Sequence, residues 1–206
     1  MHPLRWSGRG NLRWKTLPEA LKASDSFVWD RMRGMMTGPR GKHVTTLSIR
    51  LLGEMQVLCG GVPQPLPQSK KTRALLAYLV VTERPQRRER LCDLLWDVTD
   101  DPRAALRWSL TKLRPLVDRP GAARIVADRE LVRFDPCGAG VDVATIRDAL
   151  RAGASMLETT KLHELATAFR GEFLEGLELP DFHDFQAWCV AEREELRRLH
   201  RQVLET

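Results

Sequence analysis

A stretch of cationic and aromatic residues between positions 101 and 117 has the clearest chemical potential in this 206-residue sequence. Apolar residues recur there at spacings i, i+4, i+7 and i+11, at Leu106, Leu110, Leu113 and Val117. This spacing predicts a helix with one buried face. At about 100° per residue, Trp108 and Ala104 point almost directly away from that face. The candidate recognition residues on the outer face and its flanks are Arg103, Arg107, Trp108, Thr111, Lys112 and Arg114.

The residue types on that outer face suit contact with DNA. Arginine binds guanine edges bidentately, threonine and tryptophan contact the methyl group of thymine, and lysine neutralises phosphate. An alternative stays open at this point. In it, Trp108 packs beneath another element of the protein and the arginines are simply exposed to solvent.

Local signals predict how this helix is positioned. Asp101 followed by Pro102 is an N-cap with proline in the first turn, which predicts the start of the helix. Pro115 predicts a kink or an end near Arg114, so we predict a recognition helix over residues 101–114. Apolar periodicity also predicts two earlier helices, over residues 69–81 and 88–96.

Strand patterns flank these helices on both sides. Alternating apolar residues, interrupted by the hairpin signal Gly60-Gly61, predict an N-terminal antiparallel sheet over residues 45–52, 55–59 and 62–66. A second hairpin is predicted over residues 124–127 and 130–134, around Asp128-Arg129. Strands, then three helices, then a basic hairpin is the order of elements in a winged helix-turn-helix. We therefore predict an α+β fold in which the second hairpin is the wing.

Cations outside the recognition helix are candidate contacts to DNA phosphates. Backbone N–H groups at the start of a helix favour phosphate, and a basic wing suits a phosphate or minor-groove contact. The candidates are Lys70, Lys71, Arg73, Arg87, Arg88, Arg90, Arg124, Arg129 and Arg133. For the first three, an ordinary solvated helix start remains the alternative.

The run from Gln68 to Asp118 resembles the OmpR-like winged helix of the SARP transcriptional regulators, the antibiotic-regulatory-protein family. The motifs that carry this resemblance are RALLAYL, RERLCDLLW and RAALRWSLTKLR. The stretch VDVATIRDAL and the helix-rich end of the chain look like the beginning of the TPR-like bacterial transcriptional activator domain of that family. The resemblance implies a DNA-binding domain over residues 44–136 and a truncated helical domain over residues 141–206.

The same resemblance implies a sequence-specific transcriptional regulator, an activator, that binds repeated sites on double-stranded DNA. It implies that the C-terminal helices mediate homodimerisation or contact with RNA polymerase. The sequence departs from the family pattern at Arg87, where Ser or Thr usually caps the helix, and in the hairpin, which lacks the Gly-Tyr pattern common in such wings. The alternative function is a protein-interaction module on a winged-helix scaffold, or a regulatory fragment of a larger signalling protein.

The net charge of +6 is unevenly distributed along the chain. Residues 1–43 carry a surplus of +6, residues 44–135 of +5, and residues 136–206 of −5. A basic middle and an acidic end indicate modules with different partners. We expect residues 1–43 to be a disordered basic extension. Whether it lies on DNA or is an artefact of start-codon choice stays open, because Met35 and Met36 precede the first strand pattern.

Several protein classes are disfavoured by what the sequence contains. The longest apolar run, residues 74–81, is far shorter than the ~20 residues of a membrane-spanning helix, and no secretion signal pattern begins the chain. The four cysteines are scattered without a C-x-x-C pair, which indicates reduced thiols. No G-x-S-x-G or H-E-x-x-H motif occurs, and His183 between Asp181 and Asp184 fits a loop better than a metal site. We therefore expect a cytoplasmic, non-enzymatic protein without cofactor or metal.

Overall fold

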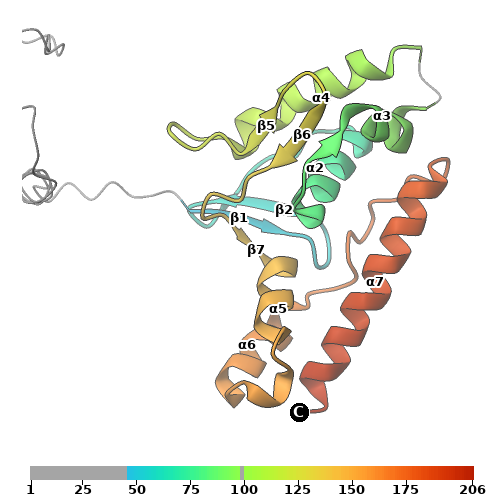
Figure 1. The fold of residues 1–206 in the computed structure, drawn as a ribbon. Helices are drawn as coiled ribbons and strands as arrows, with labels where there is room; N and C mark the ends of the chain where they lie inside the picture. Colours follow the sequence, from blue (N-terminus) through green and yellow to red (C-terminus); the bar gives the residue numbers. More distant parts are fainter. Residues whose placement is uncertain (1–45, 98–99) are drawn as a thin grey trace, which may run out of the picture. The chain divides into compact units, whose positions relative to one another are not determined.

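The computed structural model describes residues 46–97 and 100–206 (Figure 1). The predicted basic extension over residues 1–43 and part of the predicted turn over 97–101 lie outside the described residues. Contacts group residues 44–206 into one compact unit. Within the described residues, no helix combines the length and the apolar character needed to cross a membrane.

The first sheet has the strand order β3-β2-β1-β7. Its strands are β1 (Leu47–Arg50), β2 (Gln56–Cys59), β3 (Val62–Pro63) and β7 (Gly140–Val141). β2 pairs antiparallel with β1 and with β3, which confirms the predicted antiparallel start of the fold. β3 is shorter than predicted, because Pro63 and Pro65 limit the ladder hydrogen bonds it can donate. β7 pairs parallel with β1. This pairing was not predicted, because a strand of two residues is too short to show an alternating pattern in the sequence.

Helices α2, α3 and α4 follow the first strands, and their N-terminal signals behave as predicted. Their bounds are Lys70–Thr82, Arg88–Trp96 and Pro102–Val117. The Ser69 hydroxyl accepts a hydrogen bond from the N–H of Thr72 at 3.3 Å, and the Asp101 carboxylate accepts one from Ala104 at 2.8 Å. At α3 the N-cap residue is Arg87, which makes no side-chain capping bond. α3 therefore lacks the stabilisation that a Ser or Thr cap supplies.

The predicted end of α4 at Arg114 is wrong, because the helix continues through Pro115 to Val117. Proline lacks an N–H, so its position in the last turn removes one i→i−4 hydrogen bond without interrupting a longer run of bonds. The N–H of Asp118 then donates to the Arg114 carbonyl at 2.8 Å and closes the helix. The additional turn places Leu116 and Val117 in the core.

The predicted wing hairpin is confirmed and belongs to a sheet with the strand order β4-β6-β5. Its strands are β4 (Gln86–Arg87), β5 (Ile125–Ala127) and β6 (Leu131–Phe134). At the tip, Asp128 Oδ1 accepts hydrogen bonds from the N–H groups of Glu130 and Leu131 at 2.8 and 2.7 Å. β4 is too short to show a strand pattern, yet it pairs antiparallel with β6 and connects the wing directly to the start of α3.

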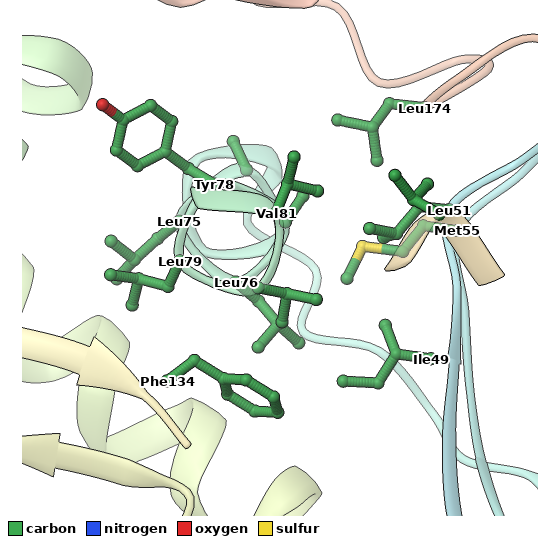
Figure 2. Packing of buried hydrophobic residues seen from close by; sticks show 14 of the residues in the cluster. Ile49, Leu51, Met55, Leu75, Leu76, Tyr78, Leu79, Val81, Phe134 and Leu174 are labelled. Atoms are coloured by element: carbon green, nitrogen blue, oxygen red, sulfur yellow. The ribbon is translucent and has the colours of Figure 1, made fainter. Parts of the chain in front are cut away.

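Helix α2 lies at the centre of the core. Figure 2 shows it nearly end-on, with side chains of the first sheet on one side and Phe134 of the wing sheet on another. Leu75, Leu76 and Leu79 of α2 are fully buried. The hydroxyls of Thr72 on α2 and Ser109 on α4 lie 2.9 Å apart in this core and form a buried hydrogen bond. Helix α2 thus contacts α4, the wing sheet and side chains of the first sheet (Figure 2).

The C-terminal helices pack on this core. They are α5 (Asp142–Leu150), α6 (Thr159–Ala168) and α7 (His183–Leu204), with a short 3₁₀ turn at Ala154–Met156. Figure 1 shows α7 running past α2 towards α5 and α6. Trp188 of α7 packs edge-on against Tyr78 of α2, with ring centroids 5.0 Å apart. The Asp142 carboxylate at the start of α5 accepts hydrogen bonds from the N–H groups of Leu51 and Leu52.

Candidate nucleic-acid interface

The outer face of α4 is exposed in the structure. Trp108 has 54% of its surface accessible, while Leu106 and Leu113 are fully buried. The alternative in which Trp108 packs beneath another element is therefore wrong. The remaining predicted recognition residues are also exposed: Arg103, Arg107, Thr111, Lys112 and Arg114.

Contacts along α4 order several of these side chains. The Thr111 hydroxyl donates a hydrogen bond to the carbonyl of Arg107 at 3.0 Å. The Lys112 ammonium lies 5.3 Å from the centroid of the Trp108 ring, within the range of a cation–π contact. Arg103 forms an ion pair with Glu89 of α3 at 3.1 Å, and both side chains are largely exposed. The exposed face is thus partly organised before any ligand binds.

A hollow of about 560 Å³ lies between the start of α3, helix α4 and the wing tip. It is lined by Arg87, Arg88, Glu89, Arg103, Leu106, Arg107, Asp128, Arg129 and Glu130. Among these lining residues arginines outnumber acids, so the hollow has a positive balance. A concave positive surface concentrates field and attracts anions. The acids at Glu89, Asp128 and Glu130 were not among the candidates from sequence, and no motif marks them.

Arg88 fastens the wing to α3. Its backbone N–H donates to the carbonyl of Glu130 at 2.8 Å, and its Nε donates to the carbonyl of Asp128 at 2.8 Å. The N–H groups of Leu131 and Glu130 hold the pKa of Asp128 below its ordinary value, because they stabilise the carboxylate. The wing tip is therefore held both by its own turn and by Arg88. A phosphate contact through the other two nitrogens of the Arg88 guanidinium stays a prediction.

The structure contradicts one candidate, Arg124, as a phosphate contact. Its side chain is buried, with 5% of the residue exposed. Its guanidinium donates to the carbonyls of Val117, Pro136 and Cys137 at 2.9, 3.1 and 3.4 Å. Arg124 therefore joins the end of α4 to the segment after the wing. A buried guanidinium needs such acceptors, and here backbone carbonyls of distant segments supply them.

The other candidate phosphate contacts are not gathered in one place. Arg87, Arg88 and Arg129 line the hollow, and Arg90 is exposed in the first turn of α3. Arg133 is half-exposed on the wing and pairs with Asp135 at 3.0 Å.

The basic start of α2 lies near the start of α7. The Lys71 ammonium sits 4.2 Å from the centroid of the Phe182 ring, just before α7 begins. Lys71 and Arg73 are half-buried, whereas Lys70 is exposed. None of these three residues lines the hollow beside α4. Their phosphate contacts stay predictions. The aromatic partner of Lys71, Phe182, lies far away in the sequence.

Metal binding finds no support in the part of the chain that the structure describes. No group of His, Cys, Asp or Glu side chains there could hold a metal ion. His183 lies at the first position of α7, after Phe182.

The comparisons with known proteins differ in what they find. No protein-family model matches the sequence, and no curated protein matches it. The structure is similar to that of Mycobacterium tuberculosis EmbR, solved in complex with a low affinity phosphopeptide, with a TM-score of 0.59. This similarity supports a SARP-like fold. The two sequences are 25% identical, and the match covers 75% of this chain and 43% of the EmbR chain. The chain therefore spans less than half the length of that neighbour.

Proposed function

We propose that this protein is a sequence-specific, DNA-binding transcriptional regulator that inserts α4 into the major groove. The observation that carries the proposal is the exposed face of α4, where Trp108 and the cations lie beside the positive hollow under the wing. A major groove about 12 Å wide admits an α-helix. Burying Leu106 and Leu113 against the core holds the helix so that this face points outward.

The similarity to EmbR supports the proposal at the level of the family, because EmbR is a SARP-family transcriptional regulator. We include in the proposal the division into a winged-helix region over residues 44–136 and the start of a TPR-like activator region over 141–206. Activation, repeated sites, homodimerisation and contact with RNA polymerase through the C-terminal helices belong to the proposal as well. The phosphopeptide in the EmbR structure is a ligand of that protein and is not part of what we propose here.

The site residues divide into base readers and phosphate contacts. Arg103, Arg107 and Arg114 share one flank of α4, from which arginine can pair with guanine edges. Lys112 on the other flank, together with Arg87, Arg90 and Arg129, suits phosphate oxygens of the two strands. The hollow beside the wing has a volume of about 560 Å³ and five arginines in its lining, which suits a stretch of the negatively charged sugar–phosphate backbone.

Salt-dependent binding tests this function directly. The full chain is titrated against a labelled generic duplex at about 50 and about 200 mM salt. A protein that neutralises six or more phosphates loses roughly 10³-fold or more in affinity between these two conditions. A protein-interaction module on a winged-helix scaffold binds the duplex weakly at both salt concentrations, and that result would overturn the proposal. Selection from a random duplex pool then identifies the preferred site.

A further inference from the structure

The outermost line of α4 is less polar than its flanks. At about 100° per residue, the positions opposite the buried leucines are Ala104, Trp108, Thr111 and Pro115. Arg107 and Arg114 lie on one side of this line and Lys112 lies on the other. Trp108, Thr111 and Pro115 on this line are exposed, and Ala104 is half-buried. Because the most protruding residues come closest to the groove floor, the exposed part of this line decides what the helix recognises there.

The hydroxyl on this central line is already engaged. Thr111 Oγ1 donates its hydrogen bond to the carbonyl of Arg107 at 3.0 Å. The line between Ala104 and Thr111 therefore presents mainly methyl groups and the indole of Trp108. The indole N–H is a donor, but most of the exposed indole surface is apolar.

The indole is also held in place. The Lys112 ammonium lies 5.3 Å from the ring centroid, one turn further along the helix. A side chain that is already ordered loses less conformational entropy when it binds. Trp108 is 54% exposed, and Lys112 restrains it. Its indole is therefore arranged for contact with an apolar group of a ligand.

We propose, on the basis of the proposed function, that this central line recognises the C5-methyl groups of thymines. Among the groups that unmodified base pairs present in the major groove, the thymine methyl is the apolar one. From Ala104 to Thr111 the helix rises about 10 Å, or about three base-pair steps. The preferred site accordingly contains A·T pairs under Trp108, next to guanines within reach of the flanking arginines.

The test removes thymine methyl groups while keeping every hydrogen-bonding group of the bases. After selection of the preferred duplex, each thymine in turn is replaced by deoxyuridine, and the affinity of the full chain is measured. Burial of one methyl group predicts about fourfold weaker binding at the critical thymine. Replacement of thymines outside the protected site serves as the matched control, with no change expected.

Protein variants connect this effect to Trp108. Trp108→Ala removes the difference between thymine and deoxyuridine at the critical position, and Trp108→Phe retains part of it. Because the side chain is exposed, both variants are expected to fold, which circular dichroism checks. The chain could bind DNA in a salt-dependent way and yet have the same affinity for thymine and deoxyuridine at every position. That result overturns this inference and leaves the proposed function standing. An unchanged thymine preference in Trp108→Ala also overturns it. Absence of DNA binding by the unaltered chain overturns both proposals.

Discussion

Glu89 of α3 and Arg103 of α4 form an ion pair 3.1 Å long at the edge of the hollow between α4 and the wing. Both side chains are largely exposed, so the pair contributes little to the stability of the fold. Its consequence is electrostatic. In the proposed complex with DNA, the Glu89 carboxylate faces an approaching phosphate, and it holds Arg103, one of the proposed contacts to the duplex.

Replacing Glu89 by Gln should therefore strengthen DNA binding. The variant removes a negative charge from the hollow and frees Arg103 for a phosphate or a base. We expect several-fold tighter binding. The plot of log affinity against log salt concentration should become steeper by up to about one, which corresponds to one additional phosphate contact. Glu178→Gln, which changes an exposed acid that does not line the hollow, is the matched control. Equal affinities for Glu89→Gln and the unaltered chain would show that DNA does not approach the hollow.

Base readers and phosphate contacts should respond differently to substitution. Arg107→Ala is expected to cost about 1–3 kcal/mol at the base that Arg107 reads and to relax sequence preference there. Arg129→Ala at the wing tip is expected to weaken binding to all duplexes alike and to reduce the salt slope by about one. Competition between selected and scrambled duplexes at two salt concentrations separates these outcomes. Uniform weakening by Arg107→Ala would contradict its assignment as a base reader.

The carboxylate of Asp142 should be important for stability. It accepts hydrogen bonds from the N–H groups of Leu51 and Leu52, and its side chain is 10% exposed. Asp142→Ala leaves these N–H groups without their acceptor and should lower the free energy of unfolding by at least about 2 kcal/mol. Urea denaturation measures the loss. Asp148→Ala on the exposed side of α5 is the control, with a change within about 0.5 kcal/mol.

The wing tip should loosen in acid. Hydrogen bonds from the backbone of Leu131 and Glu130 lower the pKa of Asp128 below its ordinary 3.8. A carboxyl with a lowered pKa in the folded protein contributes stability above its ordinary pKa, and this stability is lost as the pH falls through the lower value. Amide exchange at Leu131, corrected for its intrinsic pH dependence, should therefore show loss of protection below about pH 4. The Asp128→Asn variant should lack this transition.

The cysteines should differ in reactivity. Cys137 is exposed, whereas Cys92 and Cys189 are buried. Burial raises the pKa of Cys189 to about 12, so its reactive thiolate is scarce at pH 8. We expect iodoacetamide to modify Cys137 in the native protein and Cys92 and Cys189 after unfolding, as mapped by mass spectrometry. Because the folded protein retains the Cys189 proton more strongly, the stability from this group is lost as the pH rises from about 9 towards 12.

Features that depend on neighbours in the sequence were predictable. The apolar stripe of α4, its Asp101 cap and the wing turn at Asp128-Arg129 all follow from contacts between residues a few positions apart. Periodicity and capping act over one or two helical turns, so the amino-acid order contains the information directly. The end of α4 was predicted too early, at Arg114 instead of Val117, because the cost of Pro115 depends on how much of the helix follows it.

The environment of each cation was decided by the tertiary structure. From sequence, Arg124 and Arg129 are both basic residues of one hairpin, yet Arg124 is buried against backbone carbonyls and Arg129 lines the hollow. The carbonyls that accept from Arg124 belong to segments outside the hairpin. In the same way, the Phe182 ring beside Lys71 lies outside α2.

The sequence by itself determined that this protein has a helix with an apolar side and a cationic, tryptophan-bearing side, followed by a basic hairpin. The tertiary structure decided which of the cations remain accessible, and it placed Glu89 beside Arg103. The physical reason is one of range. Helix faces and turns arise from neighbouring residues, whereas burial and charge pairing depend on which distant segments the folded chain brings together.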